Sequence, residues 1–238
     1  MPAPVKFQNA SLNVINKKAF WNFYDHAGYL IGMNLLSLVL ALTVFGLPLA
    51  FIGIYSVTAK IVNYEVIDFK DYWRHINRLW KRGVLLVIMI ILGLSVLCIN
   101  IFFYVHLLTA MSLSFTETLL FSCMLGLMIW LFIFFIIFTL YLFPVFCQLQ
   151  TDIKATLKNS FFLMIHNLKI SFYLFFSFIF LILVGLITGV VLLGLSLSLI
   201  AVIGNTAVRE VLAQYHQPAL DEKEEMRGFR DFIKPWGD

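Results

Sequence analysis

The run GVLLVIMIILGLSVLCINIFFYVHLL, residues 83–108, contains no charged residue and is long enough to cross a hydrocarbon layer about 30 Å thick as a helix. A second run of this kind, LLFSCMLGLMIWLFIFFIIFTLYLFPVF, covers residues 119–146. The whole chain has 238 residues, of which 61% are hydrophobic and only 13% are charged. An average soluble domain has roughly 25% charged residues. The two runs and this composition predict an all-α, polytopic integral membrane protein.

Four further apolar segments predict a helical bundle with about six transmembrane helices. The charge-free stretch at 170–208 is about twice as long as one span requires, so we expect it to fold back between Gly185 and Gly194. Pro48 disfavours helical geometry in the residue before it, which predicts a turn near Gly46 to Pro48. The membrane domain is expected at 28–213, with spans at 28–47, 49–66, 83–108, 118–147, 170–190 and 192–212, between a cytoplasmic N-terminal segment at 1–27 and a cytoplasmic tail at 214–238.

The basic residues predict the orientation. All seventeen Lys and Arg residues lie at 6–18, 60–82, 154–169 and 209–234, which places them on one side of a six-span topology. Basic loops favour the cytoplasmic side, so we expect both termini inside the cell and the protein in the cytoplasmic (inner) membrane. If the segment 49–66 does not cross the membrane, the N-terminal lysines lie on the opposite side from the other basic loops. The distribution of basic residues then agrees less well with their bias toward the cytoplasm.

Two basic amphipathic helices are expected on the cytoplasmic side, at 68–82 and 152–168. In the first, DFKDYWRHINRLWKR, apolar residues recur at steps of three and four beside a ridge of basic residues. Asp68 is expected to cap this helix and Asp71 to pair with Arg74 or His75. The shared construction of the two segments predicts two related halves of the chain. The residues expected at this surface are Lys70, Trp73, Arg74, Arg78, Trp80, Lys81, Arg82, Lys154 and Lys158.

Such helices fit the headgroup layer of an anionic leaflet, so membrane lipids are the first expected partner. Docking to a partner protein, such as a transporter complex, and binding of an anionic solute are the alternatives. Nucleic acid is not an expected partner, because one helix tethered to a bilayer offers no recognisable fold for it.

Polar residues within the spans are few and form no known catalytic motif. The sequence lacks a nucleophile elbow, a zinc-binding His pair, a P-loop and a dinucleotide fingerprint, and its three cysteines lie apart in apolar segments. We therefore expect no catalytic residue, no metal and no cofactor. The intramembrane polar candidates are Asn34, Asn100 and Asn205, whose expected role is hydrogen bonding between helices, worth about 1 kcal/mol each. A cavity lined by them would favour a transporter or ligand-binding protein. Convergence of polar residues would be required for an intramembrane enzyme.

One stretch, NLLSLVLALTVFGLP at 34–48, followed by Gly53 and by Asp68-Phe69 at the start of a basic aromatic helix, resembles the YesL-like family of small bacterial integral membrane proteins. TDIKATLKNSFFLMIHNLKISFYL and SLIAVIGNTAVREVLAQY are similar to the second half of that family, so the resemblance covers residues 24–216. Phe51 and Ile54 depart from the threonine and second proline usual there.

The resemblance implies no established activity and no catalytic residues. Members are often encoded beside carbohydrate-uptake systems in Gram-positive bacteria, which implies an accessory of sugar import. We therefore expect a non-enzymatic membrane protein that assists a solute uptake complex. A transporter or binder of a small or lipid-like solute is the alternative, and an intramembrane enzyme is the third possibility.

Overall fold

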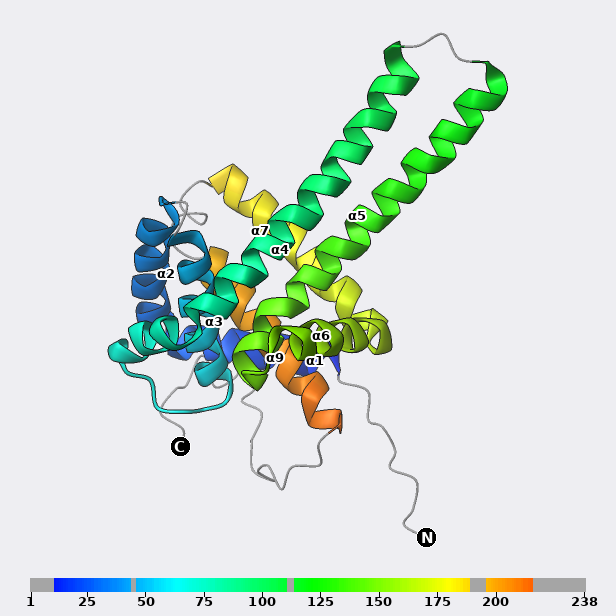
Figure 1. The fold of residues 1–238 in the computed structure, drawn as a ribbon. Coiled ribbons are helices and arrows are strands. Elements are labelled where there is room, and N and C mark those ends of the chain that lie inside the picture. Colours follow the sequence, from blue (N-terminus) through cyan, green and yellow to red (C-terminus); the bar gives the residue numbers. More distant parts are fainter. Residues whose placement is uncertain (1–10, 44–45, 111–113, 189–195, 216–238) are drawn as a thin grey trace.

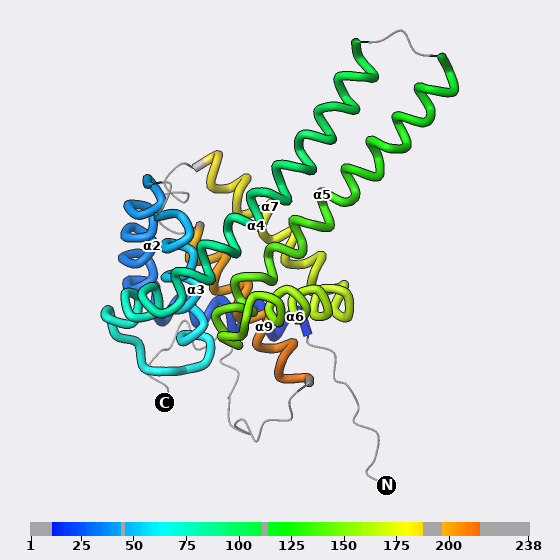
Figure 2. Tube along the Cα trace, in the orientation of Figure 1, coloured from blue at the N-terminus to red at the C-terminus, as the bar shows by residue number. Residues whose placement is uncertain are grey.

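The computed structural model describes residues 11–43, 46–110, 114–188 and 196–215, which are almost entirely helical (Figure 1). The prediction of an all-α chain is confirmed for these residues, and Figure 2 shows the path of the chain in the same orientation. The helices are α1 Leu12–Asp25, α2 Ala27–Ala41, α3 Gly46–Val62, α4 Phe69–Ala110, α5 Phe115–Leu149, α6 Ile153–His166, α7 Leu168–Thr188 and α9 Ser196–Tyr215.

In the part of the chain that the structure describes, three helices are long and apolar enough to cross a membrane: α4, α5 and α7, the last over Leu168–Ile187. Helices α2 and α3 are also apolar, but they have only 15 and 17 residues. At 1.5 Å per residue they are about 22 and 25 Å long, less than the hydrocarbon thickness of about 30 Å. Three spans thus satisfy both length and composition, and the six-span topology stays a prediction.

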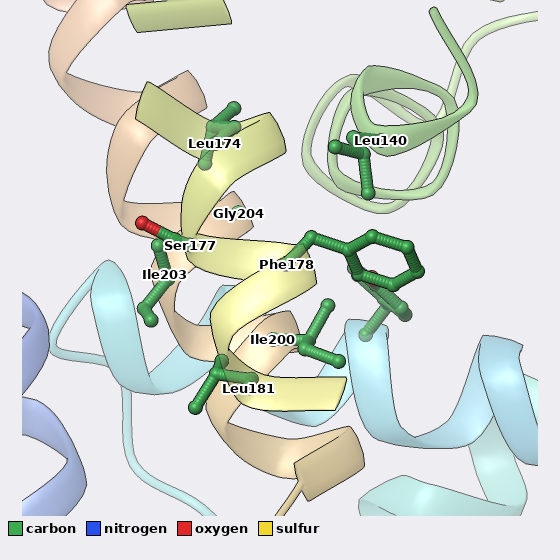
Figure 3. A pocket seen from close by; sticks show the side chains of 9 residues that line it. Leu140, Leu174, Ser177, Phe178, Leu181, Ile200, Ile203 and Gly204 are labelled. Carbon is green, nitrogen blue, oxygen red and sulfur yellow. The ribbon is translucent and has the colours of Figure 1, made fainter. Parts of the chain in front are cut away.

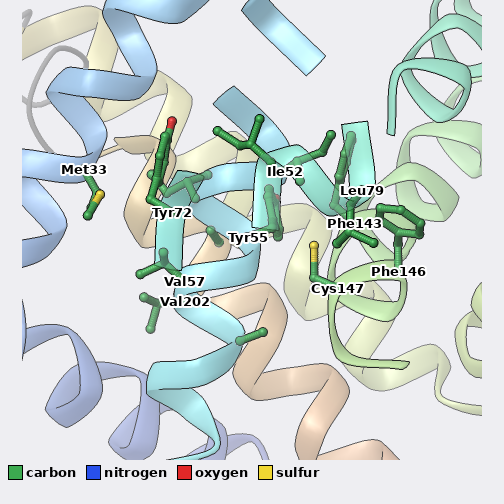
Figure 4. Close-up of a cluster of buried hydrophobic side chains, with 14 of the residues drawn as sticks. Met33, Ile52, Tyr55, Val57, Tyr72, Leu79, Phe143, Phe146, Cys147 and Val202 are labelled. Carbon is green, nitrogen blue, oxygen red and sulfur yellow. The ribbon is translucent and has the colours of Figure 1, made fainter. Parts of the chain in front are cut away.

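Helix α3 is the centre of the bundle. It packs against α2, α4, α5 and α9, and 13 of its 17 residues are buried. A helix that is apolar on every side belongs inside a protein, which explains this position. Figure 4 shows the core around it, formed by Ile52, Tyr55 and Val57 of α3 with Met33, Tyr72, Leu79, Phe143, Phe146, Cys147 and Val202 from the surrounding helices.

Helices α4 and α5 form a long hairpin that projects from the bundle (Figure 1). They approach closely at Gly93, where a Cβ atom would lie 2.4 Å from the ring of Phe135. At the tip, Ser114 and Glu117 form a capping box that satisfies the first N–H groups of α5. Large apolar side chains between Leu85 and Phe134 are exposed along both helices, as expected for contact with lipid.

The structure differs from the predicted elements at the basic helix. The segments expected as separate helices at 68–82 and 83–108 form one helix, α4, of 42 residues. Gly83 does not break it, because this glycine packs against α3, where a Cβ atom would lie 2.1 Å from Cδ1 of Ile52. The Oδ1 atom of Asp68 accepts a hydrogen bond from the N–H of Lys70 at 3.4 Å, as expected for a cap.

The expected turn at Gly46 to Pro48 is also wrong, because α3 begins at Gly46 and includes Pro48. The turn precedes Gly46, whose N–H donates to Oγ1 of Thr43 at 3.0 Å. Proline is tolerated in a first helical turn, where its missing N–H would have no acceptor within the helix. Helix α5 likewise continues through Pro144, whose ring lies beside Gly204 of α9.

Helix α1 was not expected, because the sequence was interpreted as a cytoplasmic segment up to residue 27. Its buried residues, Ile15, Ala19 and Asn22, lie at helical spacing against the bundle. The segment expected at 152–168 is divided at Asn167 into α6 and α7. The charge-free run is divided into two helices, as expected, since α7 ends at Thr188 and α9 begins at Ser196. Most of the segment from Gly185 to Gly194, where the fold-back was expected, lies outside the described residues.

Gly53 provides a test of the core packing. A Cβ atom at this position would lie 2.3 Å from the ring of Tyr72, which is fully buried and hydrogen-bonded to Ser37 at 2.8 Å. We expect Gly53→Ala to lower the free energy of unfolding by about 1–3 kcal/mol, as overpacking does. Thermal unfolding in detergent measures the change.

Gly32→Ala is the matched control, because a Cβ atom at Gly32 meets no heavy atom within 4 Å. It should be neutral or stabilise α2 by up to about 1 kcal/mol. Equal shifts in Tm for the two variants would contradict this account of the core.

Candidate functional site

The exposed basic side chains of α4 and α6 are together named the basic surface here. Nη2 of Arg82, in α4, lies 3.1 Å from Oδ1 of Asp152, which precedes α6, and this ion pair joins the two stretches. Both side chains are largely exposed, so this ion pair adds little to stability. Its main effect is to fix the start of α6 relative to α4. The basic surface consists of Lys70, Arg74, Arg78, Lys81, Arg82, Lys154 and Lys158, all exposed.

The apolar side of the first turns of α4 divides into two parts. Tyr72, Ile76 and Leu79 are buried against the bundle, whereas Trp73 and Trp80 are 42% and 47% exposed. The sequence placed all of these residues on one face of the helix. The two tryptophans therefore remain exposed beside the basic surface, together with Phe69, which is 54% exposed at the start of the helix. Aromatic rings and cations in this arrangement suit both lipid headgroups and protein partners.

Asp71 binds two cations at the edge of this surface. Its Oδ2 atom lies 2.9 Å from Nζ of Lys60, and its Oδ1 atom lies 3.0 Å from Nη1 of Arg74. The pair with Arg74 confirms the prediction from their spacing, whereas Lys60 comes from α3 and its pairing could not be found from local sequence. The hydrogen bond from Lys60 is the largest cause that lowers the pKa of the Asp71 carboxyl below its usual value.

The remaining cations of the basic surface have no carboxylate partner in the part of the chain that the structure describes. Nζ of Lys81 lies 5.6 Å from the centre of the Trp80 ring, and Nζ of Lys158 lies 5.9 Å from that of Phe162. Such contacts keep the positive charge available to other ligands. The unpaired cations are Lys70, Arg78, Lys81, Lys154 and Lys158.

A second polar group lies inside the bundle, around Asn205. Its Nδ2 atom donates to the carbonyl oxygen of Tyr55 at 3.0 Å and to Oγ1 of Thr58 at 2.7 Å. Nε2 of Gln148 donates to Oδ1 of Asn205 at 3.1 Å and to its carbonyl oxygen at 2.7 Å. Amides and hydroxyls that bond one another in this way connect α3, α5 and α9. These hydrogen-bonded residues are named the polar lock here. Hydrogen bonding between helices was predicted for Asn205, but its partners were not.

The structure does not bring Asn34, Asn100 and Asn205 together. Asn34 is fully buried in α2, and neither polar atom of its side chain has a hydrogen-bond partner among the described residues. Asn100 lies in the projecting part of α4 and donates to the carbonyl oxygen of Val96 at 2.8 Å. The cavity that would have favoured a transporter is therefore not formed by these three residues.

A narrow crevice lies between α5, α7 and α9 and reaches Tyr55 of α3 (Figure 3). It is partly open to the outside. Sequence could not reveal it, because four helices contribute its walls. The lining residues are Tyr55, Leu140, Leu174, Ser177, Phe178, Leu181, Ile200, Ile203 and Gly204.

The sequence and the structure of the chain were compared with known proteins. No family model, curated protein or solved structure matches. The YesL-like resemblance thus stays a prediction. Among the described residues, no three His, Cys, Asp or Glu side chains gather as a group that could hold a metal ion.

Proposed function

We propose that this is a non-enzymatic protein of the bacterial cytoplasmic membrane that acts as an accessory or assembly partner of a solute uptake complex. The part of its basic surface that lies on α4 is the docking site. The observation that carries the proposal is the set of unpaired cations there, Lys70, Arg78 and Lys81, next to two tryptophans that are almost half exposed. Exposed Trp and Arg residues are typical of contacts that contribute most to binding. The family resemblance adds carbohydrate as the class of solute.

The proposed topology has six crossings with both termini in the cytoplasm. In Figure 1, the ends of α2, α4 and α7 lie on one side of the bundle, and α1, α6 and the connection at 63–68 lie on the other. The basic surface is on this second side, which agrees with the bias of basic loops toward the cytoplasm.

Charge reversal of the unpaired cations tests the proposal. We expect Lys70→Glu, Arg78→Glu and Lys81→Glu, combined, to abolish co-purification of the uptake complex in mild detergent and to lower solute uptake to the level of the deletion strain. The reason is that like charges at a docking site repel the partner that unlike charges attract. Arg74 and Arg82 are left unchanged, because their ion pairs position α4.

The matched control keeps every charge: Lys70→Arg, Arg78→Lys and Lys81→Arg. This variant should retain both the partner and uptake. If the wild-type protein recovers no partner and its deletion leaves uptake unchanged, the proposed function is wrong.

A second candidate, binding of a lipid-like ligand, is favoured by the crevice of Figure 3. Its walls are apolar apart from Tyr55 and Ser177, the mixture of many apolar and few polar groups that is usual in ligand sites. We expect Ser177→Trp to fill it. Mass spectrometry of molecules released from purified protein tests this: a ligand present in wild type and absent in the variant supports it, and no ligand in either contradicts it.

A further inference from the structure

Helices α1 and α6 are built alike. Each has 14 residues, and each is followed after a single residue by an apolar helix, α2 or α7. When the two are aligned at these single residues, His26 with Asn167, five buried positions of these helices and of the helices that follow coincide. The coincident buried pairs are Ile15 with Thr156, Ala19 with Ser160, Asn22 with Leu163, Leu30 with Ser171 and Met33 with Leu174.

The likeness extends to the next helix of each series. Both α3 and α9 contain Ala-x-Ile-Gly, which ends at Gly53 in α3 and at Gly204 in α9. Each glycine faces a ring from a neighbouring helix: Tyr72 of α4 at Gly53, and Pro144 of α5 at Gly204. These likenesses run through two series of three helices, α1–α2–α3 and α6–α7–α9, on either side of the α4–α5 hairpin. The sequence had instead matched α6 with the start of α4.

The exposed sides of α1 and α6 correspond as well. Phe20 and Phe161 occupy the same aligned position and are 48% and 43% exposed. An exposed lysine, Lys17 or Lys158, stands three residues before each phenylalanine. Each helix thus carries a row of large apolar side chains next to a positive charge. The aligned rows are Phe20, Trp21 and Tyr24 in α1, of which Trp21 is half-buried, and Phe161, Phe162 and Ile165 in α6.

We propose that α1 and α6 are two copies of one membrane-surface anchor and that both bind the boundary between headgroups and acyl chains of an anionic leaflet, at the same depth. Large apolar side chains favour the acyl side of that boundary, and lysines favour lipid phosphates. Both helices lie at the end of the bundle opposite the α4–α5 tip (Figure 1). The single-residue breaks at His26 and Asn167 let each anchor lie along the surface while the next helix turns into the bilayer.

The first turns of α4 do not belong to this pair. Their apolar residues Tyr72, Ile76 and Leu79 are covered by protein. An anchor must present such residues to lipid, so the inference separates the lipid contacts of α1 and α6 from the docking role proposed for α4. Either role can fail while the other stands.

Tryptophan depth measurements on the full-length protein in vesicles test the inference. One variant retains Trp21 alone, with the other tryptophans replaced by phenylalanine, and a second carries Phe162→Trp as its only tryptophan. Quenching by lipids brominated near the headgroup end of the chain should be equal for both probes and about twice as strong as quenching by lipids brominated near the chain end, because such helices lie about 5–10 Å deep. Trp130, exposed in the middle of α5, is the deep control and should show the reverse preference.

The role of anionic lipid is tested with phosphatidylcholine vesicles prepared with and without phosphatidylglycerol. Addition of phosphatidylglycerol should strengthen quenching of both shallow probes, and Lys17→Glu with Lys158→Glu should abolish that response. The inference is overturned if iodide in the water quenches either probe while brominated lipids do not, if the two probes differ in depth, or if the lysine variant still responds.

Discussion

Replacement of Asp71 by asparagine should lower the free energy of unfolding by roughly 3 kcal/mol, the largest effect expected of a single substitution here. The carboxylate is nearly buried and binds both Lys60 and Arg74. Its loss leaves the ammonium group of Lys60 without a counter-ion at a site where only 22% of that side chain is exposed. The loss of its ion pair with Asp71 costs Arg74 less, because this side chain is 71% exposed and solvent already screens its charge. Thermal unfolding in detergent measures the difference.

Removal of both charges distinguishes an ion pair from a packing effect. Lys60→Met with Asp71→Asn should recover much of the lost stability, because no buried charge is then left uncompensated. If the double variant is as unstable as the sum of the two single variants, electrostatic coupling between Lys60 and Asp71 is not the cause.

The same carboxylate predicts a dependence on pH. Asp71 lies in the basic first turns of α4, outside the apolar part, and its pKa is lowered, first by the hydrogen bond from Lys60. A lowered folded-state pKa stabilises the protein above the unfolded-state pKa of about 3.9, and that contribution is lost as the pH falls through the folded pKa. The Tm difference between wild type and Asp71→Asn should therefore stay constant from about pH 7 to 5 and shrink below about pH 4. A constant difference down to the acid limit would contradict the assignment.

Asn205→Leu should cost about 2–3 kcal/mol, the second largest effect. The substitution removes three hydrogen bonds: those from Nδ2 of Asn205 to the carbonyl oxygen of Tyr55 and to Oγ1 of Thr58, and the one from Nε2 of Gln148 to Oδ1 of Asn205. A hydrogen bond between membrane helices contributes on the order of 1 kcal/mol, and each polar group left unpaired adds to the loss. Unfolding in detergent should show the fall in Tm.

Asn34→Leu is the matched control, because Asn34 is equally buried and both of its side-chain polar atoms lack a hydrogen-bond partner among the described residues. Leucine has nearly the same shape, and its burial is favourable, so this variant should be neutral or more stable by about 1 kcal/mol. If Asn34→Leu destabilises as much as Asn205→Leu, the hydrogen bonds of the polar lock do not account for the effect.

The sequence predicts the long apolar helices well, because a charge-free run at 83–108 or 119–146 has few alternatives to a helix. It predicts the limits of helices less well. Pro48 was expected to mark a turn, but it sits in the first turn of α3, where its missing N–H is accommodated. Pro144 lies inside α5, where its ring packs beside Gly204 of α9, a tertiary neighbour that the sequence does not reveal. Helix α1 was not predicted from the sequence, because its buried positions include Ala19 and Asn22, which give a weak apolar pattern.

For the candidate site, local spacing predicts the pair of Asp71 with Arg74 and the list of basic residues. It cannot predict which cations are already paired, since Lys60 and Asp152 come from other parts of the chain. It also cannot divide the apolar face of α4 into buried Tyr72 and exposed Trp73, because that division depends on where α3 packs. The docking surface is therefore narrower than the sequence indicates.

The position of α3 has a consequence for synthesis of the protein. The hydrogen bond from Asn205 to the carbonyl oxygen of Tyr55 spans 150 residues, so α3 leaves the ribosome long before α9 is available to cover it. At about 5–20 residues per second, this interval is roughly 8–30 s. During that time the nascent chain holds an exposed Thr58 hydroxyl and an incompletely covered central helix. Premature termination before Asn205 should thus yield a substrate for membrane quality-control proteases, whereas loss of residues beyond Tyr215 should leave this step intact.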